Sequence, residues 1–210
     1  MLILGLTGSI GMGKTTAAGA FRRFGVPVHD ADAAVHQLMS FGGAAVPLIS
    51  GAFPGVEVEG RIDRAKLGAR VFNNLDQLRR LEEIIHPIVA AHKYQFIKIA
   101  SRRRAPFVVL DVPLLFETGG DAACDAVVTV SAPEFVQARR VLARPGMDRR
   151  RLDQILEKQM PDVEKRRRSD FIVPTGLGRL ESMRTIRKII NKVSAWPARR
   201  WPPWVVRRSL

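Results

Sequence analysis

The chain has 210 residues, of which 46% are hydrophobic and 26% are charged, a composition typical of a globular protein that buries a core of its own. No run of 18 or more apolar residues occurs, so no transmembrane helix is expected. The single cysteine, Cys124, cannot form an internal disulfide. Together with the lack of a recognisable targeting signal, it predicts a protein of the reducing cytoplasm.

The formal net charge is +14, from 34 Lys and Arg against 20 Asp and Glu. Such an excess predicts an anionic partner, which can be a nucleic acid, an anionic lipid or a polyphosphate metabolite. Basic clusters lie at 102–104, 149–151 and 165–168. Because no aromatic residues are interleaved with these clusters, no nucleic acid is expected to bind the core of the protein.

Strand-like and helix-like segments alternate along the chain, which predicts a parallel sheet with crossover helices. Pro87 is expected to end or kink its helix, and Ser131 and Glu134 have the spacing of a capping box. The expected strands are 2–6, 26–30, 106–112, 126–130 and 170–173. The expected helices are 14–24, 33–39, 61–100, 134–144, 148–168 and 180–193, with a loop at 41–60.

Residues 8–15 match the pattern G-x-x-x-x-G-K-[ST], and they connect an apolar strand to a helix. Glycines in such a loop let successive backbone N–H groups turn toward phosphate oxygens, and the helix N-terminus adds its dipole. Lys14 is expected to reach the β- and γ-phosphates of a nucleotide, and the Thr15 hydroxyl to ligate Mg²⁺. The expected ATP-binding residues are Gly8, Ile10, Gly11, Met12, Gly13, Lys14 and Thr15.

Three carboxylates follow expected strands: Asp30 and Asp32 after the second strand, and Asp111 at the end of the third. In an open parallel sheet, ligands bind beyond the carboxyl ends of the strands. One of these side chains can hold Mg²⁺, and another can orient or deprotonate an attacking hydroxyl. Asp30 can equally well cap the helix that follows it. The residues alone do not decide which carboxylate is the base.

Arg140 and Arg144 are four residues apart and share one face of a predicted helix. In a phosphotransferase they can fold over the triphosphate and neutralise developing charge, or they can form a solvated basic face. His36 lies four residues after Asp32, so the two can face each other across one helical turn. His86 has no metal-ligand spacing and is more typical of a histidine with a structural partner.

These motifs, taken in order, resemble those of the dephospho-coenzyme A kinase family. Residues 5–15 resemble the P loop of that family, and residues 111–117 (D-V-P-L-L-F-E) resemble its D-x-P-L-L-F-E signature. The segment 30–32 with His36 resembles its D-A-D segment, and 86–89 resembles its H-P motif. The P loop alone is shared by many families, whereas the D-A-D and D-V-P-L-L-F-E segments are much more specific.

The resemblance covers about residues 2–193 and implies an α/β fold. The implied P-loop kinase core is a five-stranded parallel sheet of strand order 2-3-1-4-5, with helices on both faces. Residues 195–210, a basic tail that holds all three tryptophans, lie outside the resemblance and are expected to be disordered. The implied parts are a nucleotide-binding core (1–60, 106–139 and 169–194), a helical coenzyme-A-binding insert (61–105) and a mobile lid (140–168).

The implied activity is transfer of the γ-phosphoryl group of ATP, with Mg²⁺, to the 3′-hydroxyl of dephospho-coenzyme A, and a monomer is favoured. Asp32 is the implied base. Met12 and Pro174 depart from the family pattern, because a small residue and a polar residue are more usual there. The implied catalytic residues are Asp32, Lys14, Arg140 and Arg144. The implied substrate-binding residues are Asp32, His36, His86, Asp111 and Leu114. The implied metal ligands are Thr15 and Asp111.

Two other functions stay open on the residues alone. Another P-loop kinase, acting on a nucleoside or nucleotide, would share the P loop and the lid but need not carry the motifs at 86–87 and 113–117. An ATP-dependent nucleic-acid-binding protein would account for the net charge. For the tail, a membrane-interface contact or a weak nucleic-acid contact are the alternatives to disorder.

Overall fold

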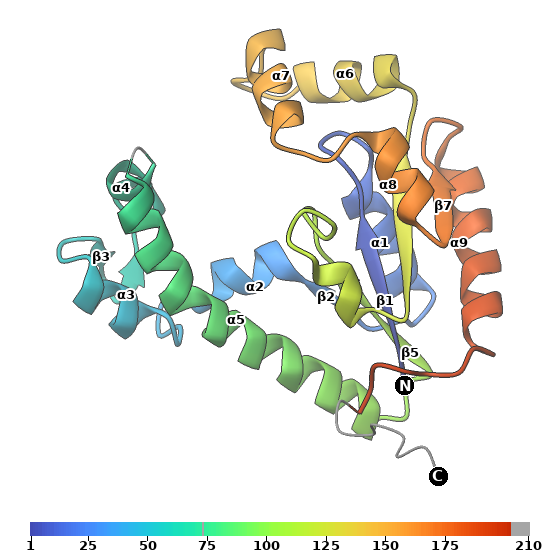
Figure 1. Ribbon diagram of the computed structural model, residues 1–210, viewed down its shortest axis with the longest axis horizontal. Helices are drawn as coiled ribbons and strands as arrows, with labels where there is room; N and C mark the ends of the chain where they lie inside the picture. Colours follow the sequence, from blue (N-terminus) through green and yellow to red (C-terminus); the bar gives the residue numbers. More distant parts are fainter. Residues whose placement is uncertain (73, 203–210) are drawn as a thin grey trace. The chain divides into compact units, whose positions relative to one another are not determined.

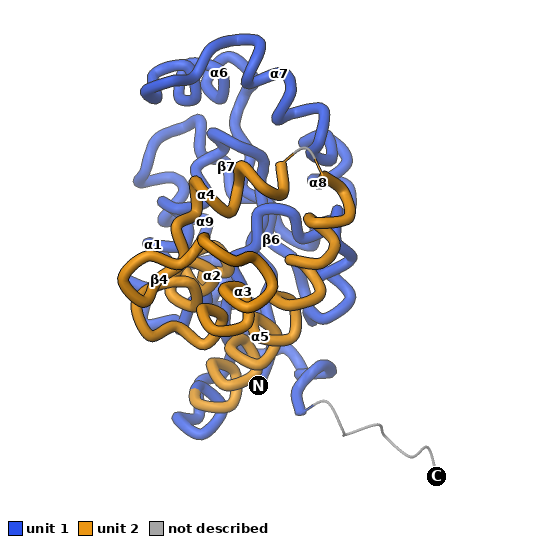
Figure 2. Tube along the Cα trace, turned by 90° about the vertical axis from the view of Figure 1, so that its left-hand side faces the viewer, with its two compact units in different colours: residues 1–29, 100–210 blue, residues 30–99 orange. Residues whose placement is uncertain are grey.

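The computed structural model describes residues 1–72 and 74–202, which form two compact units. The first unit consists of Met1–His29 and Ala100–Leu210, and the second of Asp30–Ile99 (Figure 2). Each unit has a hydrophobic core of its own. Within the described ranges, no helix is both long enough and apolar enough to cross a membrane.

The first unit is built on a five-stranded sheet with the order β2-β5-β1-β6-β7 (Figure 1). The central strand β1 runs parallel to β5 on one side and to β6 on the other. Counted among these five strands alone, the order is 2-3-1-4-5, so the predicted P-loop kinase core is confirmed. The strands are β1 Leu2–Thr7, β2 Val28–Asp30, β5 Phe107–Asp111, β6 Ala126–Ser131 and β7 Phe171–Pro174.

All residues of β1, β5 and β6 are buried, because helices cover the inner strands of a parallel sheet. This burial explains why the strands read in the sequence as continuous apolar runs. Helices α1 and α9 pack against each other, α1 against β5 and α9 against β7, while α8 packs against β6. The helices are α1 Lys14–Arg23, α6 Glu134–Leu142, α7 Arg149–Glu157, α8 Asp162–Arg168 and α9 Arg179–Val193, with a short 3-10 helix η1 at Gly120–Ala123.

The second unit is helical apart from one short hairpin. Its core contains Ile49, Phe53 and Val56, which are at most 2% exposed, together with Leu67 of α4. Several side chains of α5 pack against this core. The elements are α2 Ala31–Leu38, α3 Val46–Ala52, β3 Glu57–Val58, β4 Arg61–Ile62, α4 Arg64–Val71 and α5 Leu75–Arg102, the last of which continues into the first unit.

The secondary structure of the second unit differs from the sequence prediction in one segment. The loop expected at 41–60 contains α3 and the β3–β4 hairpin, because the apolar residues between its glycines and prolines are buried in the core. The compact unit itself spans Asp30–Ile99, and the coenzyme-A-binding insert expected at 61–105 stays a prediction. Pro87 also does not end its helix, since α5 continues through it.

Two details of the first unit also differ from the sequence prediction. The helical stretch expected at 148–168 consists of two helices, α7 and α8, separated by residues 158–161. Ser131 does not cap α6, whose N-cap residue is Pro133 and has no side-chain hydrogen bond. Instead Ser131 is the last residue of β6, and its Oγ donates to Asp162 Oδ2 at 2.7 Å.

The expectation that residues from 195 onward are disordered is wrong for the part of the tail that the structure describes. Trp196 is half-buried against the hydrophobic core of the first unit. The backbone N–H groups of Arg199 and Arg200 donate to Asp125 Oδ1 at 2.6 and 3.0 Å. The indole N–H of Trp201 donates to Ser101 Oγ at 3.1 Å, so the tail is bound as far as Trp201. Residues 203–210 lie outside the described residues.

Candidate functional site

The P loop leaves the carboxyl end of β1 and enters α1 at Lys14. Gly11 and Gly13 have φ angles of 76° and 91°, a region that side chains with L chirality rarely adopt. Gly13 is the N-cap residue of α1 and supplies no side-chain cap. The first N–H groups of this ten-residue helix therefore stay available to an anion, together with the helix dipole.

Packing against α6 also requires a glycine at position 11. A Cβ atom built on Gly11 would lie 2.6 Å from Val141 Cγ2 and 3.0 Å from the backbone oxygen of Gln137. The side chain of Met12 is 3% exposed and packs in the core of the first unit, where its Sδ accepts from the N–H of Ala132. The side chain of Met12 therefore does not fill the phosphate-binding side of the loop.

Lys14 and Asp111, both predicted from the sequence, form an ion pair with 2.7 Å between Nζ and Oδ1. Asp111 is the last residue of β5 and only 1% exposed, while the side chain of Lys14 is 16% exposed. A buried carboxylate requires a charged or hydrogen-bonding partner, and a charge-assisted bond of this length is strong. The pair therefore fixes the ammonium group of Lys14 beside the P loop, at the carboxyl ends of β1 and β5.

Three successive carbonyl groups of the P loop, at residues 10–12, accept hydrogen bonds from side chains outside the loop. A trans peptide carries its C=O and its N–H on opposite sides. The N–H groups of Gly11 and Gly13 therefore face away from these outer partners. The bonds run from Gln137 Nε2 to Ile10 O at 2.8 Å, from an Arg140 amino group to Gly11 O at 3.3 Å, and from Thr175 Oγ1 to Met12 O at 2.6 Å.

The two arginines that the sequence predicts as a pair have different surroundings. Arg140 is half-buried and also donates to Thr175, to Oγ1 at 3.1 Å and to the backbone oxygen at 2.7 Å. Arg144 is exposed. In the structure Arg140 thus binds the backbone of both the P loop and the segment after β7. A contact of Arg140 or Arg144 with phosphate stays a prediction.

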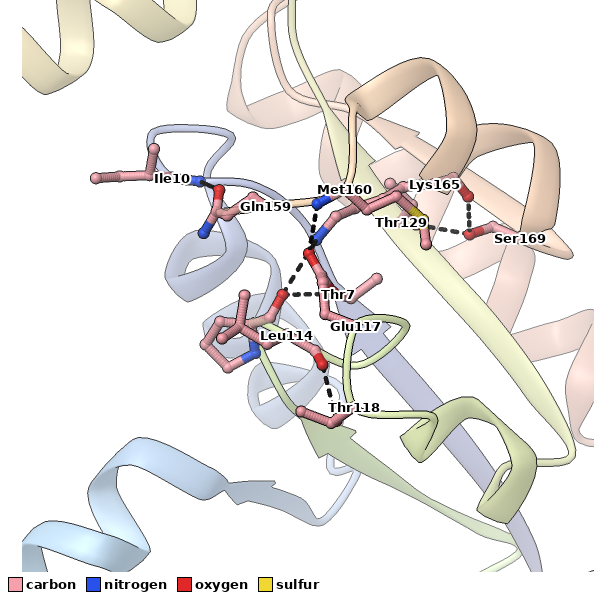
Figure 3. A network of polar contacts seen from close by, with 11 residues as sticks. Thr7, Ile10, Leu114, Glu117, Thr118, Thr129, Gln159, Met160, Lys165 and Ser169 are labelled. Carbon is pink, nitrogen blue, oxygen red and sulfur yellow. Dashed lines mark hydrogen bonds and ion pairs between the residues drawn. The ribbon is translucent and has the colours of Figure 1, made fainter. Parts of the chain in front are cut away.

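A buried ion pair that the sequence did not single out lies next to the P loop (Figure 3). Lys165 of α8 is 0% exposed, although it belongs by sequence to a basic cluster. Its Nζ lies 2.8 Å from Glu117 Oε1 and donates to Pro113 O at 3.2 Å. Pro113 O also accepts from Thr7 Oγ1 at 2.9 Å. The pair therefore connects α8, the segment after β5 and the end of β1.

The Glu117 carboxylate is held ionised by this network. Burial alone would raise its pKa, but the hydrogen bonds from Lys165 and from the backbone N–H of Met160 outweigh the burial, so the pKa of Glu117 lies below its usual value. The Met160 N–H lies 2.8 Å from Glu117 Oε1. The adjacent residue, Gln159, accepts from the N–H of Ile10 at 3.0 Å.

The other predicted site residues of the second unit lie on α2 and α5. Asp30 accepts from the N–H of Ala33 at 3.0 Å and so caps α2, as one of its two interpretations predicted. Asp32 is exposed in the first turn of α2, and His86 is exposed on α5. The ring of His36 lies 3.5 Å from Ser40 Oγ. The roles of Asp32, His36 and His86 in binding or catalysis stay predictions, as does that of Leu114, whose side chain is 39% exposed.

A cavity of about 620 Å³ lies in the second unit beside His36. Two arginines, Arg61 and Arg64, and the ring of Phe41 line it. Phe41 is 82% exposed. None of these three residues carried a sequence prediction, because Phe41 falls in the loop expected at 41–60, and Arg61 and Arg64 fall at the start of the helix expected at 61–100. Their combination of positive charge and apolar surface suits a ligand that carries both phosphate and apolar groups.

A five-stranded parallel sheet with this phosphate-binding loop at the carboxyl end of its central strand defines a P-loop kinase. The family model for dephospho-CoA kinase matches residues 2–177 of the chain. The chain belongs to the dephospho-CoA kinase family.

Individual relatives agree with this assignment. The chain is 52% identical over 201 residues to a dephospho-CoA kinase of Rhodopseudomonas palustris, covering 95% of this chain and 100% of the relative. It is 60% identical over 166 residues to that of Paramagnetospirillum magneticum, covering 79% of this chain and 78% of the relative. A crystal structure from Thermus thermophilus is similar with a TM-score of 0.78 and 34% identity, covering 91% of this chain and 96% of that one.

Gly11→Ala is expected to raise the KM for ATP about tenfold or more, because the new Cβ forces the P loop away from α6 at a φ that alanine disfavours. Gly19→Ala, on the same helix as Lys14, is the matched control, since a Cβ there meets no atom within 4 Å. Steady-state kinetics with varied ATP measure both variants. Equal KM values for Gly11→Ala and the native chain would contradict the packing argument.

Glu117→Gln is expected to lower the free energy of unfolding at pH 7 by about 2 kcal/mol, because Lys165 stays buried without its counter-charge. Because the pKa of Glu117 is lower in the folded chain than in the unfolded one, ionisation of Glu117 stabilises the native chain at pH values above the ordinary pKa of 4.5. This contribution is lost as the pH falls below about 4.5. The difference between native and variant chains should therefore shrink on acidification.

Urea denaturation at pH 7, 5, 4 and 3 measures that difference. Glu164→Gln is the control, because Glu164 forms an exposed pair with Arg167 at 3.7 Å, and such pairs contribute about 0–1 kcal/mol. A Glu117→Gln difference that stays constant from pH 7 to pH 3 would show that the charge of Glu117 is not the cause.

Proposed function

We propose that the protein carries out the reaction of its family, the transfer of the γ-phosphoryl group of ATP to the 3′-hydroxyl of dephospho-coenzyme A, with coenzyme A and ADP as products. The observation that carries this proposal is the Lys14–Asp111 pair beside the P loop of a chain that belongs to this family. The loop supplies N–H groups and an ammonium group to a triphosphate, and phosphoryl transfer depends mainly on positioning and charge stabilisation.

Mg²⁺ is the proposed partner of ATP. No group of three or more His, Cys, Asp or Glu side chains in residues 1–72 and 74–202 is arranged to hold a metal ion by itself. This suits Mg²⁺, which usually takes one or two protein ligands and completes its shell with water and substrate phosphates. The Thr15 hydroxyl in the first turn of α1 and the Asp111 carboxylate are the proposed ligands. When bound, the ion would neutralise charge on the β- and γ-phosphates.

The cavity beside His36 is the proposed acceptor site. Arg61 and Arg64, which line this cavity, would pair with phosphate groups of the acceptor, and the exposed ring of Phe41 would offer an apolar contact. Asp32, which lies four residues before His36 on α2, is the proposed base. It would accept the proton of the 3′-hydroxyl while the oxygen attacks the γ-phosphorus and the bond to the ADP oxygen breaks.

The net positive charge supports a phosphorylated acceptor more than a nucleic acid. Several members of the basic clusters are engaged in pairs within the protein, such as Lys165 with Glu117, Arg168 with Asp121, and Arg149 with Asp153. A cytoplasmic location and a monomeric state remain part of the proposal, on the strength of the sequence.

The acceptor is tested by ADP release with Mg·ATP and a panel of dephospho-coenzyme A, nucleosides, nucleoside monophosphates and single-stranded nucleic acid. Turnover is expected with dephospho-coenzyme A alone. Turnover with a different small acceptor would keep the P-loop kinase and overturn the substrate. ADP release that depends on nucleic acid would replace the proposal with the nucleic-acid-binding alternative.

Asp32→Asn is expected to lower kcat with dephospho-coenzyme A about 100-fold, the usual contribution of a general base. Asp30→Asn is the neighbouring comparison, because asparagine also accepts the capping hydrogen bond from Ala33, and its kcat should stay within about threefold of the native value. Loss of turnover in Asp30→Asn with turnover preserved in Asp32→Asn would move the base to Asp30.

Arg64→Ala is expected to raise the KM for dephospho-coenzyme A about tenfold, because a charged hydrogen bond to phosphate is lost, and to leave the KM for ATP unchanged. Arg70→Ala is the matched control, since Arg70 is exposed on the same helix and does not line the cavity. If both variants change the KM for dephospho-coenzyme A equally, general surface charge accounts for the effect.

A further inference from the structure

One residue of the P loop, Ile10, is held at both of its backbone polar groups by glutamine side chains. Its carbonyl accepts from Gln137 Nε2 at 2.8 Å, and its N–H donates to Gln159 Oε1 at 3.0 Å. The two contacts have opposite polarity, because Gln137 acts as the donor and Gln159 as the acceptor. Neither glutamine is adjacent to the loop in sequence, since they follow Ile10 by 127 and 149 positions.

Each glutamine is itself fixed by its surroundings. Gln137 is 5% exposed on α6, and its backbone oxygen lies close to where a Cβ of Gly11 would be. Gln159 follows the end of α7 and directly precedes Met160, whose N–H is bound by Glu117 at 2.8 Å (Figure 3). The amide groups thus approach Ile10 from two elements that have separate anchors in the first unit.

We propose that Gln137 and Gln159 are positioning residues that set the orientation of the Ile10 peptide groups, and through them the phosphate-binding N–H groups of the P loop. Holding the Ile10 carbonyl outward turns the N–H of Gly11 to the opposite side, because both belong to one planar peptide. The two glutamines also stand at the two ends of the segment 138–158, which contains most of α6 and α7. A displacement of either end of that segment would therefore change the orientation of the Ile10 peptide groups.

The opposite polarity of the two contacts gives the proposal a specific test with one substitution at two positions. Glutamate has the shape of glutamine but only accepts hydrogen bonds when ionised. Gln159→Glu keeps an acceptor for the Ile10 N–H, whereas Gln137→Glu removes the donor and places a carboxylate against the Ile10 carbonyl. Both variants add the same charge near the P loop, so any general repulsion of ATP is common to the two.

The measurement is the affinity for Mg·ATP by isothermal titration calorimetry, with the thermal midpoint of each variant recorded in parallel. Gln137→Glu is expected to bind ATP about tenfold more weakly than Gln159→Glu, because only the first leaves a P-loop carbonyl without a donor. The KM for the acceptor is expected to be the same in both variants. Since ATP binding is read directly, the result does not depend on the identity of the acceptor, and the inference rests on the proposed function only for ATP as the donor.

Two further variants keep the test decisive if the buried glutamate at position 137 unfolds the chain. Gln137→Met and Gln159→Met remove each hydrogen bond without adding a charge, and each is expected to weaken ATP binding about fivefold to tenfold. Equal losses in Gln137→Glu and Gln159→Glu would overturn the proposal. So would a folded Gln137→Met that binds ATP as tightly as the native chain.

Discussion

The polar groups of the P-loop backbone must have partners on both sides of the loop, and the rest of the site depends on this constraint. A loop that offers its N–H groups to phosphate has to direct neighbouring carbonyls elsewhere, and buried carbonyls need donors. Here the carbonyls of residues 10–12 find them in Gln137, Arg140 and Thr175. These donors come from α6 and from the segment after β7, so the shape of the loop depends on the C-terminal half of the chain.

The surroundings of the P loop also depend on the C-terminal half of the chain through the buried ion pair of Glu117 and Lys165. Lys165 is fully buried, and its contacts with Glu117 and Pro113 join α8 to the segment that follows Asp111. Removing one member of a buried pair leaves an uncompensated charge, which is far more costly than losing a surface pair. The segment from Asp111 to Glu117 carried the specific resemblance in the sequence. It contains both a residue of the candidate site, Asp111, and one member of the buried ion pair, Glu117.

The second unit shows that regular structure can be hidden by composition. Residues 41–60 are rich in glycine and proline, yet they contain α3 and the β3–β4 hairpin and contribute Ile49, Phe53 and Val56 to a core. Val46, Ile49 and Phe53 have a helical spacing, but this apolar run is short and lies among glycines and prolines, so the segment reads as a loop. Burial against α4 and α5, which no local pattern encodes, stabilises them. Arg61 and Arg64, at the start of the helix expected at 61–100, entered the candidate site only because they line the cavity beside His36.

The sequence by itself determined the sheet, its strand order through the family resemblance, and the position of Lys14, Thr15 and Asp111, because buried strands and a glycine-rich loop have local patterns. Only the tertiary structure decided which distant side chains support that loop. Gln137, Gln159 and Lys165 have no periodic or spacing signal, since their role comes from partners about 50 to 150 positions away. The same holds for the tail after α9, which reads as irregular. Its residues Arg199 and Arg200 donate backbone N–H groups to Asp125, a contact between segments that meet only after folding.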